Sequence, residues 1–93
     1  MERFVREVVQ TSQFKQDLKR VKHSGRYSID DLLLVVELLS SCESLPEKYK
    51  EHNLNGNWRH YKECHVKPDW LLIYKLSAEK LVLARTGSHS ELF

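Results

Sequence analysis

The chain has 93 residues, which is enough for a single domain with one modest hydrophobic core. Hydrophobic residues make up 41% of the sequence and charged residues 30%, a balance that excludes a disordered chain. No apolar run reaches the roughly 18 residues of a membrane-spanning helix. Two cysteines are too few for a disulfide framework, and the first residues lack the apolar segment of a secretory signal. We therefore expect one cytoplasmic domain over residues 1–93, with no membrane partner.

Charge is distributed unevenly along the chain, although the net formal charge is only +2. Residues 1–26 carry seven Lys and Arg against three acidic residues, a net charge of +4. Residues 27–51 carry two against six, a net of −4, and residues 52–93 carry six against four, a net of +2. Basic segments on both sides of the acidic one suit a polyanion, although a mixed, solvated surface gives the same counts.

The first predicted elements are a strand over Phe4–Val9 and a short basic helix that follows it. The strand is rich in β-branched residues. Ser12 is a suitable N-cap for the helix, and Gly25 ends it. Apolar residues recur in the helix at helical spacing, at Phe14, Leu18 and Val21.

A second helix is predicted to begin after Ser28 as its N-cap, with Asp31 completing a capping box. Its apolar stripe consists of Ile29, Leu32, Leu33, Val36 and Leu39. Pro46 ends the pattern, and the polar stretch from there to Gly56 predicts a long loop.

Three strands are predicted in the C-terminal half, over Trp58–His65, Trp70–Leu76 and Leu81–Thr86. Short turns separate them, so neighbouring strands must run antiparallel. The order β-α-α-β-β-β therefore predicts an α+β fold, in which a mostly antiparallel sheet carries the two N-terminal helices on one face.

Groups suited to proton transfer are concentrated after residue 51. Four of the five histidines lie there, together with an aspartate and an arginine: His52, His60, His65, His89, Asp69 and Arg85. Cleavage of RNA needs a base for the 2′-hydroxyl, a positive group for the phosphate, and an acid for the leaving 5′-oxygen. Histidine or aspartate suits the first and last tasks, and arginine suits the second.

Each of these residues also has a purely structural interpretation. His60 suits packing or solvent exposure, Asp69 suits a turn, and Arg85 suits a surface ion pair. Both tryptophans suit the core or its rim. A zinc site built from histidines and Asp69 lacks any short-spaced pair of ligands, so we expect no metal and no cofactor.

Three stretches of the chain resemble YafQ-type toxins of the RelE/ParE superfamily. Leu45–Trp58 is similar to the loop that leads into the sheet of these toxins, and Glu63–Tyr74 to their central hairpin. Leu83–Phe93 resembles their C-terminal end, including the terminal phenylalanine. The three motifs occur in the family's order and at compatible spacing, whereas the helices match poorly.

The resemblance implies a RelE/ParE-like fold and a metal-independent, ribosome-dependent mRNA endonuclease. It also implies a cognate antitoxin that binds the toxin in a hetero-oligomer, with the ribosome and its mRNA as further partners. His89 matches the general acid, and Arg85 matches the phosphate clamp. The group that supplies and orients the base corresponds to His52, His65 and Asp69. Predicted substrate contacts are Phe93, Trp70, Lys67 and Arg59.

Two other functions are compatible with this fold. One is a non-enzymatic toxin similar to ParE, which poisons DNA gyrase and has no use for three histidines around an arginine. The other is a plain nucleic-acid-binding or protein-interaction domain, in which basic surface residues would matter and His89 would not.

Overall fold

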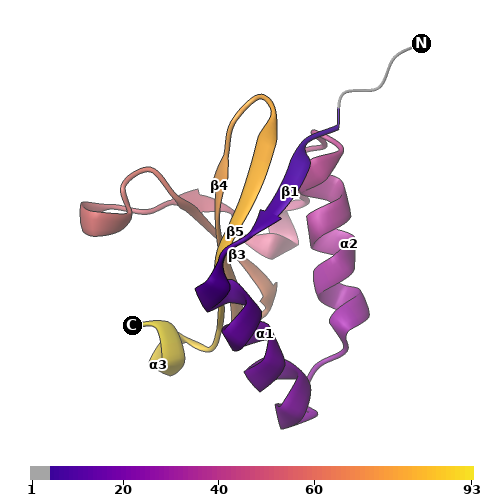
Figure 1. Ribbon diagram of the computed structural model, residues 1–93, viewed down its shortest axis with the longest axis vertical. Helices are drawn as coiled ribbons and strands as arrows, with labels where there is room; N and C mark the ends of the chain where they lie inside the picture. Colours follow the sequence, from indigo (N-terminus) through magenta and orange to yellow (C-terminus); the bar gives the residue numbers. More distant parts are fainter. Residues whose placement is uncertain (1–4) are drawn as a thin grey trace.

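The computed structural model describes residues 5–93 and contains one sheet with three helices. In chain order (Figure 1) the elements are β1 (Glu7–Gln10), α1 (Ser12–Ser24), α2 (Ile29–Ser40), the 3-10 turn η1 (Glu47–Tyr49), β2 (His52–Asn53), the 3-10 turn η2 (Gly56–Trp58), β3 (Lys62–Lys67), β4 (Trp70–Leu76), β5 (Lys80–Gly87) and α3 (His89–Leu92). The predicted α+β order is confirmed, and the structure adds the two-residue β2 and the one-turn α3. No helix within residues 5–93 is both long and apolar enough to cross a bilayer.

The five strands form one sheet in the order β1-β5-β4-β3-β2. β1 runs parallel to β5, and the other three pairs are antiparallel, as the prediction of a mostly antiparallel sheet requires. β1 pairs only with residues 80–83, and β2 only with residues 62–63. Parts of β5 and β3 therefore extend past their strand neighbours, and other segments must cover those edges.

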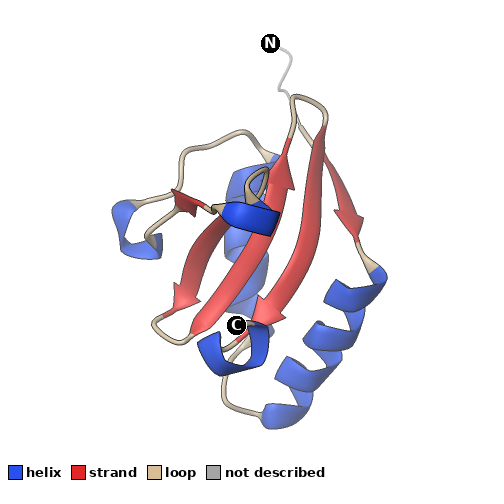
Figure 2. Cartoon of the chain, turned by 90° about the vertical axis from the view of Figure 1, so that its left-hand side faces the viewer, coloured by secondary structure: helices blue, strands red, loops and turns tan. Residues whose placement is uncertain are grey.

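Both long helices pack on the same face of the sheet, which confirms the predicted layer arrangement. Figure 2 shows α2 behind the sheet and α1 beside β5, next to the end of β1. Alternate residues of β4 face these helices, because side chains on a strand point to opposite faces in turn. The buried cluster includes Phe14, Val21, Leu32, Val35 and Leu39 from the helices and Trp70, Leu72, Tyr74, Leu81 and Leu83 from the strands.

The capping residues predicted the ends of both long helices, with one error at the start of each helix. α1 is capped by Thr11 and not by Ser12, because the Thr11 hydroxyl accepts a hydrogen bond from the Phe14 backbone at 3.0 Å. Gly25 ends α1 with φ +66°, as expected, and Ser28 caps α2. The capping box is absent there, because the carboxylate of Asp31 forms an ion pair with Lys67 instead.

The predicted strand over residues 58–65 is wrong at its start. Trp58 belongs to η2, where its ring packs edge-on against Tyr61 at 5.0 Å, and the strand runs over Lys62–Lys67. Gly56 has φ +66° and makes the turn that delays the strand. β1 begins at Glu7, and the predicted contribution of Phe4 lies outside the described residues.

A buried carboxylate covers the edge of β5 beyond the end of β1. Asp17 of α1 has no exposed surface, and its Oδ2 accepts the backbone N–H of Thr86 at 3.2 Å. The same carboxylate receives Arg85 through Nε at 2.7 Å and through Nη2 at 3.2 Å. α1 therefore covers the edge of β5 where β1 stops, and the Asp17 carboxylate connects the N-terminal helix to the last strand.

Substitution Asp17→Asn should lower the free energy of unfolding by about 3 kcal/mol, since it leaves Arg85 without its counter-charge. Burial acts to raise the pKa of Asp17, but hydrogen bonds from Arg85, Gln13 and the Thr86 backbone lower it below its ordinary value of 3.8. A carboxyl with a lowered folded-state pKa stabilises the protein above its unfolded-state pKa, and this stabilisation disappears as the pH falls through the folded-state pKa. The difference between parent and variant should therefore shrink below about pH 4.

Urea unfolding at pH 7 and at acid pH measures this difference. Glu79→Gln, which removes an exposed carboxylate in the β4–β5 turn, is the matched control and should change stability by less than about 0.5 kcal/mol. Equal stability of parent and Asp17→Asn at neutral pH would contradict the structural role of this carboxylate.

Candidate active site

The sheet face opposite α1 and α2 carries most of the residues predicted to be catalytic. Glu63 and His65 alternate along β3 with residues of the core, so their side chains point away from the helices. Strand pairing places one row of residues across this face: His52, Glu63, Ile73 and Arg85. The ring of His65 lies 6.5 Å from that of His52 and 5.7 Å from that of His89, measured between centroids. The predicted histidines 52, 65 and 89 therefore form one cluster.

His52 is held through both ring nitrogens. Its Nδ1 lies 2.9 Å from the Lys50 carbonyl, and its Nε2 lies 3.3 Å from Glu63 Oε1. A carbonyl can only accept, so Nδ1 carries a proton, and the contact with the carboxylate is best satisfied when Nε2 carries one too. Because the Glu63 side chain is only 6% exposed, it provides a largely buried negative charge beside this ring. His52 thus lies in a fixed orientation between a backbone carbonyl and a largely buried carboxylate.

A second carboxylate fixes the start of β2. The buried hydroxyl of Tyr74 on β4 donates a hydrogen bond to Glu51, the residue before His52. Burial and this bond raise the pKa of Tyr74, so the phenol remains a donor at any ordinary pH. The contact joins the two-residue strand to the centre of the sheet and thereby positions His52.

His65 has the opposite arrangement, with one nitrogen held and one available. Its Nδ1 lies 3.2 Å from the carbonyl of Pro68 in the β3–β4 turn, so Nδ1 is the donor. In a neutral imidazole the other nitrogen then carries a lone pair. The backbone therefore holds His65 as a ring whose Nε2 can accept a proton.

His89 is the first residue of α3 and lies beside Asp69. It follows the last strand in a helical turn that is closed by a capping box between Ser88 and Glu91. Both the backbone N–H and the Nδ1 of His89 lie 3.4 Å from Asp69 Oδ1. These hydrogen bonds lower the pKa of Asp69, so its carboxylate stays ionised and turns the Nε2 of His89 outward.

The turn that carries His89 is fixed from α1. Arg20 Nε lies 2.7 Å from Glu91 Oε2, and its Nη2 lies 3.2 Å from Asp17. Gly87 has φ +154°, and a Cβ at this position would come within 3.0 Å of both Arg20 and Glu91. Glycine is favoured there by the backbone conformation, and a larger residue would also press on the Arg20–Glu91 ion pair.

Arg85 lies at the other end of the row across the sheet. Its bidentate contact with Asp17 raises the pKa of the guanidinium, so the group is always charged. Two strand spacings, roughly 10 Å, separate its backbone from that of Glu63. The side chain is 23% exposed, so it is held by Asp17 but not fully enclosed.

The predicted substrate contacts have different surroundings. Trp70 cannot contact a substrate, because its side chain is fully buried, stacks on Tyr27 at 4.9 Å and donates from Nε1 to Thr86. This prediction is wrong, and the structural interpretation of Trp70 is correct. Phe93 is 63% exposed beside the His89 turn. Lys67 is exposed and paired with Asp31, and Arg59 is exposed next to η2, outside the histidine cluster.

Glu63 is a functional candidate that the sequence analysis missed. The alternation along the predicted strand already placed it on the same face as His65, two residues away. Donor atoms of Glu63, His65 and His89 all lie within 4.8 Å of one another, a separation that one metal ion could bridge. Ligands this far apart in sequence have no short motif, and for that reason spacing alone did not reveal the set.

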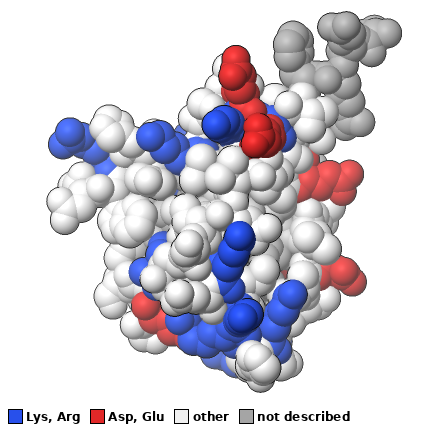
Figure 3. Space-filling view, viewed as in Figure 1, with Lys and Arg blue, Asp and Glu red and all other residues white. Residues whose placement is uncertain are grey.

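Basic side chains border this region. α1 carries Lys15, Lys19, Arg20 and Lys22. Figure 3 shows Lys and Arg gathered over the lower part of this view, where Figure 1 places α1. The N-terminal charge excess of the sequence therefore becomes a continuous basic surface near α3, as expected for binding a polyanion.

Comparison with known proteins gives consistent matches along the chain. The family model described as YafQ, a bacterial toxin of type II toxin-antitoxin systems, matches residues 6–93. The chain is 36% identical over 88 residues to the mRNA interferase toxin YafQ of Escherichia coli K12, covering 95% of this chain and 96% of that protein. It is 31% identical over 87 residues to a putative toxin YafQ of Haemophilus influenzae, covering 87% and 85%.

Three solved structures are similar over almost their full lengths. YafQ from Escherichia coli BL21(DE3) has a TM-score of 0.87 at 36% identity, covering 95% of this chain and 98% of that one. A copper-bound mutant toxin from Helicobacter pylori has a TM-score of 0.88 at 34% identity, covering 96% and 99%. The Escherichia coli DinJ-YafQ toxin-antitoxin complex gives a TM-score of 0.84 at 37% identity, covering 95% and 97%.

The hydrogen bond from His65 to Pro68 predicts a single tautomer. At a pH where His65 is neutral, its ring should carry the proton on Nδ1, and nitrogen-detected NMR of the side chain should show an unprotonated Nε2. His23, an exposed histidine of α1, is the reference ring. A dominant form of His65 with the proton on Nε2 would contradict its arrangement as a base.

Proposed function

Because the chain belongs to the YafQ family of bacterial type II toxins, we propose that it is an mRNA interferase, an endoribonuclease that cuts ribosome-bound mRNA. The observation that carries the mechanism is the histidine cluster, in which two rings are held through Nδ1 with Nε2 left for the substrate. RNA supplies its own nucleophile, so the protein needs only to move protons and stabilise charge.

His65 is the proposed general base. With Nδ1 bonded to the Pro68 carbonyl, its Nε2 takes the proton of the 2′-hydroxyl as that oxygen attacks the phosphorus. The new bond joins the 2′-oxygen to phosphorus, and the bond from phosphorus to the 5′-oxygen breaks. The products are a 2′,3′-cyclic phosphate and a free 5′-hydroxyl.

His89 is the proposed general acid. Asp69 faces its Nδ1 and stabilises the doubly protonated ring, which donates the Nε2 proton to the leaving 5′-oxygen. The rings of His65 and His89 are 5.7 Å apart between centroids, so both are near enough to act on one scissile phosphate.

The negative charge that develops on the phosphate in the transition state requires a fixed positive group. Arg85, which Asp17 holds and which stays partly exposed, is the proposed group. His52, held between the Lys50 carbonyl and Glu63, lies 6.5 Å from the His65 ring and is the proposed positioning residue for that ring. Phe93 is exposed beside α3, where it can stack on a base next to the cleavage point.

A ParE-like gyrase poison is the less favoured function. Such a toxin needs only a binding surface, whereas the arrangement of His65, His89 and Arg85 supports a base, an acid and a fixed cation. A simple interaction domain gives no reason to orient two imidazoles through Nδ1. The arrangement therefore favours catalysis over both alternatives.

We further propose that a cognate antitoxin inhibits the toxin by covering this face. The related Escherichia coli protein forms the DinJ-YafQ toxin-antitoxin complex, which supports a hetero-oligomer for this chain as well. An acidic antitoxin segment would match the basic surface of α1 and the exposed cations of the site.

His89→Ala should lower the single-turnover rate of cleavage of ribosome-bound mRNA by about 10²–10⁴-fold, because the general acid is lost. Its thermal stability should change little, by about 0.5 kcal/mol or less, because His89 is exposed. His23→Ala is the matched control and should cleave within about threefold of the parent rate. Cleavage by His89→Ala within threefold of the parent would exclude His89 as the acid.

Cleavage should persist in EDTA, because histidines and an arginine supply every proposed step. Added Cu²⁺ should inhibit, since an ion bound by Glu63, His65 and His89 would occupy the nitrogens that transfer protons. A copper-bound relative is consistent with such a donor set. Cleavage assays with chelator and with graded copper test the metal independence and the inhibition by copper. Activity that is lost in EDTA and restored by a metal would contradict the metal-independent mechanism.

A further inference from the structure

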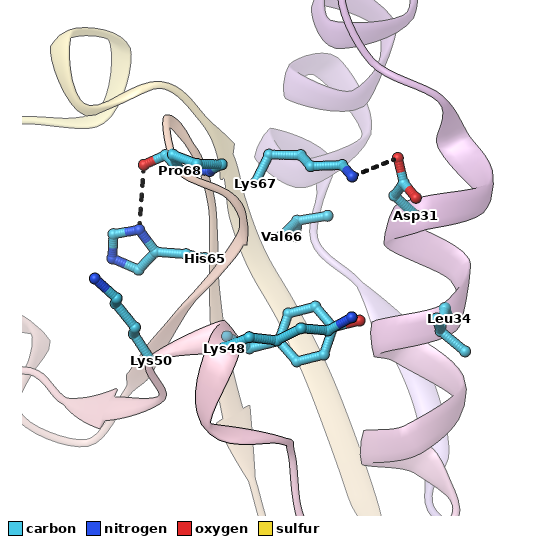
Figure 4. A pocket seen from close by; sticks show the side chains of 9 residues that line it. Asp31, Leu34, Lys48, Lys50, His65, Val66, Lys67 and Pro68 are labelled. Carbon is cyan, nitrogen blue, oxygen red and sulfur yellow. Dashed lines mark hydrogen bonds and ion pairs between the residues drawn. The ribbon is translucent and has the colours of Figure 1, made fainter.

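A pocket of about 410 Å³ lies directly beside the proposed active site (Figure 4). It occupies the edge of β3 where β2 has ended, because β2 pairs with residues 62–63 alone. α2, η1 and the β3–β4 turn form its walls. The volume is within the range of small-molecule sites and is large for a gap between packed elements.

The floor of the pocket is apolar. Val66 of β3 and Pro68 of the turn line it, and Leu34 of α2 faces them from the other side. Leu34 is 49% exposed although it belongs to a helix whose inner face is buried. A leucine that borders a cavity in this way provides a surface for the flat face of an apolar or aromatic ligand.

The rim of the pocket is basic. It carries Lys48, Lys50 and Lys67 against one acidic residue, Asp31, which is 3.5 Å from Lys67. The amino group of Lys48 lies 5.1 Å from the Tyr49 ring, so the side chain extends across the mouth. Figure 4 shows the Lys50 amine directed toward His65. A flat apolar floor below a cationic rim matches a nucleotide, which combines a base with a phosphate.

The pocket is continuous with the catalytic cluster through His65, which lines both. In the proposed mechanism His65 acts on the 2′-hydroxyl, and that hydroxyl belongs to the nucleotide on the 5′ side of the scissile phosphate. The proposed acid, His89, lies on the other side of His65 from this pocket. It protonates the leaving 5′-oxygen, which belongs to the nucleotide on the 3′ side of the scissile phosphate. The direction of the RNA chain across the site is therefore fixed by the order of the two histidines.

We propose that this pocket binds the nucleotide on the 5′ side of the cleavage point, and that it contributes to the base preference there. The base lies on Leu34, Val66 and Pro68, while Lys48 meets the adjoining phosphate. The inference rests on the proposed ribonuclease function and adds to it a subsite and a strand polarity. An acidic antitoxin segment would also satisfy the lysines, and the experiment below distinguishes it from a nucleotide.

Two exposed residues of the pocket test the proposal without touching the catalytic groups. Leu34→Ala removes part of the floor, and Leu33→Ala is its control, since Leu33 is 55% exposed on the same helix and does not line the pocket. Lys48→Gln removes one rim charge, and Lys80→Gln at the far end of the sheet is its control. Thermal melts should show all four variants folded.

Cleavage is measured on four ribosome-bound mRNAs that differ only in the base 5′ to the cut. Leu34→Ala should change the ratio of kcat/KM among the four bases by roughly tenfold, because apolar contacts discriminate on this scale. Lys48→Gln should raise KM about fivefold for all four and leave kcat nearly unchanged, because a phosphate contact carries no base information. The two control variants should match the parent.

Binding of a 2′-deoxy trinucleotide, which cannot be cleaved, is followed by the methyl NMR signals of Leu34 and Val66. These signals should shift, and Lys48→Gln should weaken binding about fivefold, whether or not the parent cleaves RNA.

Unchanged base preference in Leu34→Ala, or methyl signals unmoved by the trinucleotide, would overturn the subsite. Loss of antitoxin binding in these variants with cleavage intact would also overturn it and would assign the pocket to the antitoxin. A parent that binds the trinucleotide and cuts no mRNA would refute the ribonuclease function alone.

Discussion

The buried carboxylate of Asp17 is the interaction on which both the fold and the site depend. It replaces a missing strand at the edge of β5, holds Arg85 in a fixed orientation, and anchors Arg20, which in turn holds the turn bearing His89. A charge without exposed surface is tolerated only when its partners satisfy it completely. Here those partners are Arg85, Arg20, Gln13 and the Thr86 backbone, and the first of them is the proposed phosphate clamp. Loss of the ion pair would therefore disturb the packing of α1 and the geometry of catalysis together.

The sheet separates the stabilising and the chemical functions of the chain between its two faces. One face buries an apolar core under α1 and α2, and the other presents histidines whose orientation is set by backbone carbonyls and carboxylates. Backbone carbonyls are rigid acceptors that cannot exchange roles with a donor. Two of the three rings therefore have a fixed proton on Nδ1 before any substrate binds, which reduces the reorganisation that the reaction requires.

Periodicity and turn residues were sufficient to predict the layer arrangement and the limits of β4. They were insufficient for Trp58, because a glycine turn and an aromatic contact moved it out of the strand. The prediction of Trp70 as a substrate contact was wrong for another reason, since burial depends on the neighbours that tertiary packing supplies. Asp17 stood in the sequence as one acid in a basic helix, 68 residues before its arginine partner. No local rule joins residues at that distance, so the pairing of Asp17 with Arg85 could be seen only in the structure.

The parallel pairing of β1 with β5 has a consequence for how the molecule forms. Its contacts join residues 7–10 to residues 80–83, so the topology has long sequence separations and predicts slower folding than a helical protein of this size. On a ribosome synthesising this chain, the N-terminal helix would emerge long before the strand that neutralises its buried acid. The nascent polypeptide therefore cannot display a finished catalytic face until nearly all of it has been translated.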